Sequence, residues 1–223
     1  MDEQTIVALI AVGVFILVGF PVHEFSHAWA AYKLGDSTAR YMGRLTLNPR
    51  VHLDPLGSVV LAVSAVFFSV FIGWAKPTPV NPFNLRYGRR GESMVAVAGP
   101  LSNLVMAAAV AIPLRLIWSD LQLVFTVGGS LPLALIYNTA WYFVLINVFL
   151  FMFNLLPIPP LDGWRALTGL LDARLAFQLR QVEPYGLLLL VGVVLIGGRY
   201  IVSFAFFIFD LLTGGARPVG LPL

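Results

Sequence analysis

Residues 5–34 read TIVALIAVGVFILVGFPVHEFSHAWAAYKL, an apolar stretch interrupted by a short run of ionisable side chains. A helix needs roughly 20 mostly apolar residues to cross the ~30 Å hydrocarbon core of a membrane, and this stretch is long enough. Ionisable side chains near the middle of such a helix cost roughly 2.5–3.5 kcal/mol each and are functional by default, which disfavours the alternative of two satisfied core histidines. The stretch therefore predicts a membrane helix that carries a functional site.

The ionisable run is His23-Glu24-Phe25-Ser26-His27, with the spacing H-E-x-x-H. Residues four apart lie on the same face of a helix, so both imidazoles can reach one metal ion. Zinc accepts histidine nitrogen at about 2.0–2.1 Å. Glu24 follows His23 directly and can reach a water molecule at the ion without being a ligand. We expect His23 and His27 to bind the metal and Glu24 to act as the catalytic base.

A third protein ligand would leave one coordination position open for water, and there are three candidates. Asp162 lies in the segment 154–163, NLLPIPPLDG, whose prolines break a helix, while Gly163 allows a tight turn. Irregular backbone at membrane depth is tolerated only where it is buried in protein or lines a watery cavity. The rivals are His52 and Asp54, although Asp54 also suits a helix N-cap before Pro55. We favour Asp162. Cysteine is absent, so thiolate ligands are excluded.

The composition predicts an all-α polytopic membrane protein. Of its 223 residues, 59% are hydrophobic and 11% charged, whereas a soluble domain is nearer a quarter charged. The candidate membrane segments are 5–34, 56–74, 93–118, 131–153 and 185–212. The last contains Gly197-Gly198-Arg199 and forms either one kinked span or two short ones. We expect about four to six membrane segments in a single domain, 1–223, with a short amphipathic helix around 164–180.

The distribution of basic residues predicts the topology, because cytoplasmic loops are enriched in Lys and Arg. Basic residues flank the segment 56–74 on both sides: Lys33, Arg40, Arg44 and Arg50 before it, and Lys76, Arg86, Arg89 and Arg90 after it. A single crossing cannot leave both flanks in the cytoplasm, so we expect this segment to be re-entrant. The loop 120–130 has no basic residue and should face outward. The candidate metal site then lies toward the cytoplasmic side of the cell membrane.

Two stretches near the candidate site read as short membrane-associated β-strands. Residues 43–48 alternate polar and apolar side chains, and residues 78–81 contain the proline expected of an edge strand. An edge strand could hold an unwound peptide by strand addition. We expect one of these stretches to act as a substrate clamp.

Three motifs together resemble the site-2 protease family of intramembrane metalloproteases. They are HEFSHAWAAYKLGD at 23–36, AGPLSN at 98–103 and FNLLPIPPLDG at 153–163. The resemblance implies one Zn²⁺ per chain on His23, His27 and Asp162, with Glu24 as the base. It also implies that the Asn154 amide polarises the substrate carbonyl, a role that competes with capping of a helix end. The chain is similar to compact bacterial-type members without an appended sensory domain.

This resemblance implies an intramembrane zinc metalloendopeptidase that cuts within or near the transmembrane segments of other membrane proteins. The expected partners are such substrates and the lipid bilayer. Nucleic acid is not expected, because the sequence has no dense basic patch with interleaved aromatic residues. Two alternatives are a metal or ion transporter, which would repeat its ligands in inverted halves, and an inactive scaffold of the same fold. The intact Glu24 argues against the scaffold.

Overall fold

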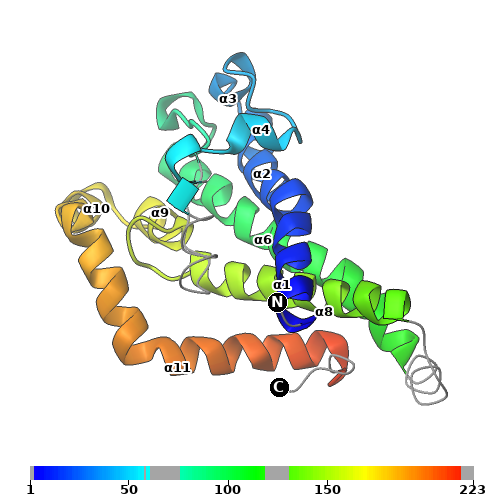
Figure 1. The fold of residues 1–223 in the computed structure, drawn as a ribbon. Coiled ribbons are helices and arrows are strands. Elements are labelled where there is room, and N and C mark those ends of the chain that lie inside the picture. The colour runs from blue at the N-terminus through cyan, green and yellow to red at the C-terminus, as the bar shows by residue number, and fades with distance from the viewer. Residues whose placement is uncertain (1–2, 58, 61–75, 119–130, 217–223) are drawn as a thin grey trace.

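The computed structural model describes residues 3–57, 59–60, 76–118 and 131–216, and this part of the chain is mostly helical (Figure 1). The long helices are α1 (Glu3–Val14), α2 (Phe20–Lys33), α6 (Arg89–Leu116), α8 (Leu131–Asn154) and α11 (Gly186–Thr213). The short helices are η1 (Phe15–Gly19), α3 (Thr38–Tyr41), α4 (Pro49–His52), η2 (Pro82–Asn84), α9 (Asp162–Leu170), α10 (Ala173–Arg180) and η3 (Glu183–Tyr185).

Four helical stretches in the described residues are long and apolar enough to cross a membrane. They are Ile6–Lys33, Arg89–Leu116, Pro132–Asn154 and Ala173–Thr213. These stretches confirm the predicted membrane helices at 5–34, 93–118 and 131–153. Most of the predicted re-entrant segment 56–74, and the predicted outer loop 120–130, lie outside the described residues.

The first span carries a π-helical turn just before the H-E-x-x-H run. The turn η1 leads directly into α2, whose first turn contains Pro21. A proline inside a helix has no N–H and its ring clashes with the carbonyl four residues earlier. A π-turn relieves that conflict with one wider turn, and such turns are frequent at functional sites. The helix thus continues through Pro21 and presents His23 and His27 on one face.

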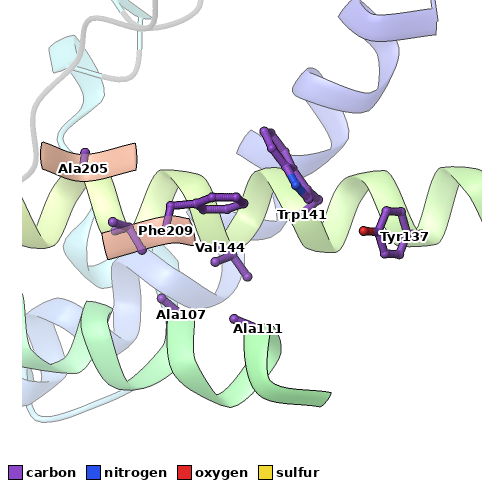
Figure 2. Packing of buried hydrophobic residues seen from close by; sticks show 8 residues of the cluster. Ala107, Ala111, Tyr137, Trp141, Val144, Ala205 and Phe209 are labelled. Atoms are coloured by element: carbon purple, nitrogen blue, oxygen red, sulfur yellow. The ribbon is translucent and has the colours of Figure 1, made fainter. Parts of the chain in front are cut away.

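The central helix α6 packs against α2, α8, α9 and α11. Its distal half forms a hydrophobic core with α8 and α11 (Figure 2). The alanines of α6, Ala107 and Ala111, are fully buried, and they allow α8 to approach closely, as small residues do between membrane helices. On the other side, Trp141 of α8 meets Phe209 of α11 with ring centroids 4.8 Å apart. This core fixes the bundle and leaves the proximal half of α6 to contact α2.

The C-terminal region differs in detail from the expectation. The predicted helix at 164–180 is two helices, because Asp172 ends the run and caps α10 by accepting hydrogen bonds from the N–H groups of Arg174 and Leu175, both at 2.9 Å. The apolar region 185–212 forms the single helix α11, which changes direction along its length in Figure 1. This helix contains the pair Gly197-Gly198, and glycine pairs are common sites of helix bending.

Neither predicted strand forms in the described residues. Residues 43–48 follow turns and bends, and residues 78–81 have no regular secondary structure. Local hydrogen bonds explain the difference. The Thr46 carbonyl accepts from the His52 imidazole at 2.8 Å, and the Asn48 side chain caps α4. Asn81 similarly caps η2 through its side chain.

Candidate metal centre

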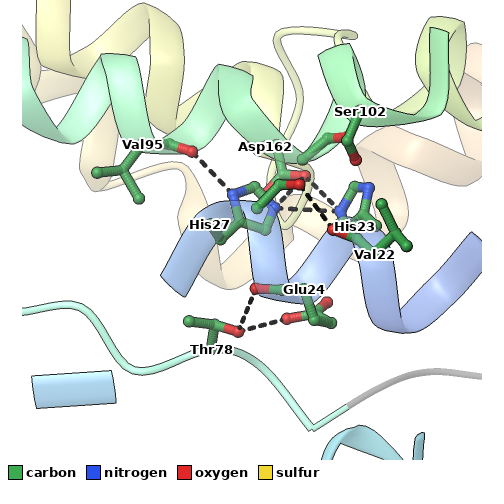
Figure 3. Close-up of polar contacts among 10 residues, drawn as sticks. Val22, His23, Glu24, His27, Thr78, Val95, Ser102 and Asp162 are labelled. Atoms are coloured by element: carbon green, nitrogen blue, oxygen red, sulfur yellow. Dashed lines mark hydrogen bonds and ion pairs between the residues drawn. The ribbon is translucent and has the colours of Figure 1, made fainter. Parts of the chain in front are cut away.

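Three possible metal ligands converge at the contact between α2 and the start of α9 (Figure 3). The Nε2 atoms of His23 and His27 are 3.1 Å apart. Asp162 Oδ2 lies 3.3 Å from the first and 3.2 Å from the second. A tetrahedral zinc site with bonds of about 2.0–2.1 Å has ligand atoms ~3.3–3.4 Å apart. The spacing and the chemistry of this donor set therefore fit zinc.

The sequence brings these ligands together through one helix and one tight turn. The helix α2 places both histidines one turn apart. Asp162 begins α9 after the proline-rich segment 155–161. Gly163 must be a glycine here, because a Cβ atom would lie 2.3 Å from the carbonyl oxygen of Leu155. Gly163 lies in the first turn of α9, so its missing side chain serves this close packing and not the tight turn predicted from the sequence.

A backbone carbonyl orients the second histidine. His27 Nδ1 lies 2.8 Å from the carbonyl oxygen of Val95 on α6 and donates a hydrogen bond to it. This contact fixes the ring so that Nε2 faces His23 and Asp162, as a metal ligand requires. Within the described residues, the buried Nδ1 of His23 has no hydrogen-bond partner.

The electrostatics of Asp162 match a ligand role. Burial alone would raise the pKa of this carboxyl group, but the hydrogen bonds from His23 and His27 outweigh burial and hold its pKa well below the usual range. The group is therefore a carboxylate at neutral pH, the form that binds a metal ion.

Gly99 of α6 lies directly against the two imidazoles. A Cβ atom at this position would be 2.2 Å from Nε2 of His27 and 2.7 Å from Nε2 of His23. Only a residue without a side chain leaves room for the donor set. Gly99 belongs to the motif AGPLSN at 98–103, but the motif alone does not indicate its role. The available signal was a glycine in the interior of an otherwise ordinary helix, where it is unfavourable.

Glu24 follows His23 on α2 and is buried, and its carboxylate points toward Thr78, a partner that the sequence did not reveal (Figure 3). Thr78 Oγ1 donates a hydrogen bond to Glu24 Oε2 at 2.7 Å (Figure 3). Both residues line a cavity of about 340 Å³, together with His27, Asp162, Glu92, Arg165 and residues 77–80. The cavity gives a small molecule or a short peptide segment access to Glu24.

The rival ligands His52 and Asp54 serve local structure. His52 is fully buried and donates from Nε2 to the carbonyl oxygen of Thr46. Asp54 accepts a hydrogen bond from the Gly57 N–H at 2.8 Å, which is the N-cap interaction expected before Pro55. Among the residues that the structure describes, Asp162 joins the two histidines in the possible metal-binding group, and neither rival does.

Asn154 is the last residue of α8 and is half-buried. The segment 155–161 leads from it to Asp162, so both residues flank the same turn. Asn154 lies outside the residues that line the cavity.

Membrane-length helices that hold two histidines and an aspartate within reach of one ion, with a buried glutamate next to the first histidine in the sequence, are typical of a membrane metalloprotease. Residues 8–197 match the model of Peptidase family M50, and the chain belongs to this family, the site-2 proteases.

Curated relatives carry matching names. "Putative zinc metalloprotease YwhC" of Bacillus subtilis is 38% identical over 174 residues, which cover 77% of this chain and 74% of the relative. "Putative zinc metalloprotease Rip2" of Mycolicibacterium smegmatis is 32% identical over 84% of this chain and 70% of its own length. "Putative zinc metalloprotease MJ0611" of Methanocaldococcus jannaschii is 32% identical over 73% and 69%, respectively. No solved structure matches the chain significantly.

Proposed function

We propose that this chain is an intramembrane zinc metalloendopeptidase, which hydrolyses peptide bonds within or near the transmembrane segments of other membrane proteins. The observation that carries the proposal is the buried Glu24 carboxylate, one residue from a ligand of a zinc-compatible donor set and at the wall of a cavity. His23, His27 and Asp162 would hold one Zn²⁺ per chain.

When bound, zinc would supply Lewis-acid chemistry that activates water and polarises the scissile carbonyl. Glu24 takes a proton from the attacking water and passes it to the leaving amine. Asn154 donates a hydrogen bond to the negative charge that develops on the carbonyl oxygen. His27 is held in place by the Val95 carbonyl, so the donor set stays fixed while the proton moves.

The substrate segment must be unwound locally, because a helix ties up the N–H and C=O groups of the bond to be cut. Residues 77–80 line the cavity beside Glu24, whereas residues 43–48 do not. Of the two predicted stretches, this supports 78–81 as the substrate clamp, since its residues 78–80 line the cavity. Pro77 and Pro79 alternate with Thr78 and Val80. In an extended chain, the backbone N–H groups of consecutive residues point to opposite edges. Proline has no N–H group, so only the edge formed by Thr78 and Val80 keeps N–H donors for strand addition.

The cavity faces the cytoplasm in this proposal, since basic residues flank the segment 56–74 on both sides and Arg165 lines the cavity. Single cysteines test both the side and the clamp, because the chain contains no cysteine of its own. In closed inside-out vesicles, an impermeant maleimide should label Val80→Cys and the 98% exposed Phe83→Cys. An added substrate peptide should slow labelling at Val80→Cys alone. Labelling only from the opposite side would disprove the topology, and no protection would disprove the clamp.

Removal of the metal tests the proposed activity directly. The purified chain should carry one zinc ion and cleave a single-span membrane protein. Treatment with 1,10-phenanthroline should abolish cleavage, and equimolar Zn²⁺ should restore it. Elemental analysis and product mass spectrometry provide the measurements. Cleavage that continues after complete zinc removal would refute a zinc protease.

The alternatives give different results in the same experiments. An inactive scaffold would bind zinc and cleave nothing. A transporter would move metal across proteoliposomes. Within the described residues there is one possible metal-binding group, built from α2 and α9, which favours a catalytic site over a transport path of repeated ligands.

A further inference from the structure

Residues 77–80 line the cavity together with Glu24. They belong to the segment 76–86, which we call the strap. It is tied to the end of α2 by hydrogen bonds at several points. Asp36 Oδ2 accepts from the Asn81 N–H at 2.7 Å, and Asp36 Oδ1 accepts from the Asn84 side chain at 3.1 Å. In addition, the Arg86 N–H donates to the Leu34 carbonyl at 2.7 Å. The strap therefore depends on the same helix that carries Glu24.

Asp36 is the centre of this attachment. Its side chain is completely buried and also accepts hydrogen bonds from the N–H and hydroxyl of Thr38. Burial alone would raise the pKa of this carboxyl group, but the hydrogen bonds from Thr38, Asn81 and Asn84 outweigh burial and lower its pKa. A buried carboxylate with this many donors has little freedom to move, so it fixes the position of the strap.

The strap delivers one side-chain hydroxyl to the candidate active site. Thr78 is buried, and its Oγ1 contacts the Glu24 Oε2 at 2.7 Å and the Glu24 carbonyl oxygen at 3.3 Å. A glutamate side chain has three rotatable bonds, and a hydrogen bond to one oxygen removes most of that freedom. The second carboxylate oxygen, Oε1, then keeps a fixed direction for the transfer of a proton.

We propose that Thr78 is a positioning residue, which holds the Glu24 carboxylate in the orientation needed for proton transfer. Asp36 places Thr78 at this point by fastening the strap that carries it. This inference rests on the proposed function of Glu24 as the base. It assigns a role to the segment after the predicted re-entrant stretch that neither the motifs nor the metal ligands require.

The first experiment compares Thr78→Val, which keeps the shape and removes the hydroxyl, with Thr78→Ser, which keeps the hydroxyl. Loss of a hydrogen bond to a charged group should lower kcat about ten- to a hundredfold in Thr78→Val, with KM and zinc content unchanged. Thr78→Ser should restore most of the activity. Thr213→Val is the matched control, because it removes a buried threonine hydroxyl that donates to the Phe209 carbonyl in α11, away from the candidate site. Equal activity in Thr78→Val and wild type would overturn the proposal.

The second experiment asks whether Asp36 acts through the strap. Asp36→Asn replaces one carboxylate oxygen with an NH₂ group. This group would face the N–H donors that now bond to the carboxylate, so the substitution should loosen the strap. In that background, maleimide labelling of Val80→Cys should become several-fold faster, while the exposed Phe83→Cys should label at its usual rate. Unchanged labelling at Val80→Cys would overturn the role of Asp36. This measurement does not require any protease activity.

A double-mutant cycle joins the two results. Asp36→Asn should lower kcat in the wild-type chain and have less than about a twofold effect in the Thr78→Val background, because both changes disturb one contact. Additive effects would show that Asp36 acts by another route. If the wild-type chain cleaves no substrate beyond the level of Glu24→Gln, the proposed function fails, and the labelling result still decides whether Asp36 holds the strap.

Discussion

Replacement of Glu24 by glutamine should leave zinc bound and lower kcat by about 10²–10⁴-fold, the usual contribution of a general base. The amide has almost the same shape as the carboxylate, and its oxygen can still accept the hydrogen bond from Thr78. It cannot accept a proton from water at neutral pH. The buried position of Glu24 makes replacement by a bulk-solvent base inefficient. The measurements are zinc content by mass spectrometry and the rate of product formation.

Glu183→Gln is the matched control for this change. Glu183 Oε1 accepts a hydrogen bond from the Trp164 indole at 3.0 Å, outside the cavity, and an amide oxygen can replace it. Full activity in Glu24→Gln would show that Glu24 is not the catalytic base.

In the same assay, Asn154→Leu separates the two roles proposed for Asn154. A lower kcat with normal thermal stability supports the contact with the substrate carbonyl, whereas a lower melting temperature with normal kcat supports capping of α8.

Replacement of Gly99 by alanine should abolish zinc binding and, with it, activity. The added Cβ would lie 2.2 Å from the ligand nitrogen of His27, so either the imidazole or α6 must move. Intrinsic helix propensity favours alanine by roughly 1 kcal/mol, so a loss cannot come from a weaker helix. Loss of a residue that only hydrogen-bonds to a metal ligand typically lowers metal affinity by about 10–100-fold. We expect Gly99→Ala to lower the zinc affinity by more than that.

Gly192→Ala in α11 provides the control, because among the described residues no atom outside its own stretch of helix lies within 4 Å of the Cβ that it would add. It should keep zinc and activity and should not lower the melting temperature. Isothermal titration of the metal-free chains with zinc gives the affinities. Wild-type affinity in Gly99→Ala would show that the contact between α6 and the imidazoles is not needed for the donor set.

Local sequence was sufficient for those parts of the site that a single element creates. The spacing of His23 and His27 predicts a shared helix face, and that face forms. Asp162 lies too far along the chain from the histidines for residue spacing to link them. It could be predicted as the third ligand only from the helix-breaking prolines before it, together with the family resemblance. The predicted helices at 5–34, 93–118 and 131–153 are present for the same reason, since apolar length alone determines them.

Contacts between distant segments could not be predicted. Thr78 is 54 positions from Glu24, and nothing in a proline-rich stretch indicates which residue its hydroxyl will meet. Gly99 is informative only when the imidazoles beside it are known. The predicted strand at 43–48 failed because a helix cap and a buried histidine compete for its backbone, and competition of that kind is decided by tertiary structure.

The possible ligands come from two helices that are far apart in the chain, α2 near the beginning and α9 well beyond the middle. An ion bound by both helices would be a reversible cross-link between the two halves of the bundle. It would close a very long loop, and this constraint on the chain is lost whenever the ion leaves. Because a ligand that binds only the folded state stabilises it, the metal-loaded chain would resist unfolding and proteolysis better than the metal-free chain. Zinc supply would then set the lifetime of the protein in the membrane as well as its activity.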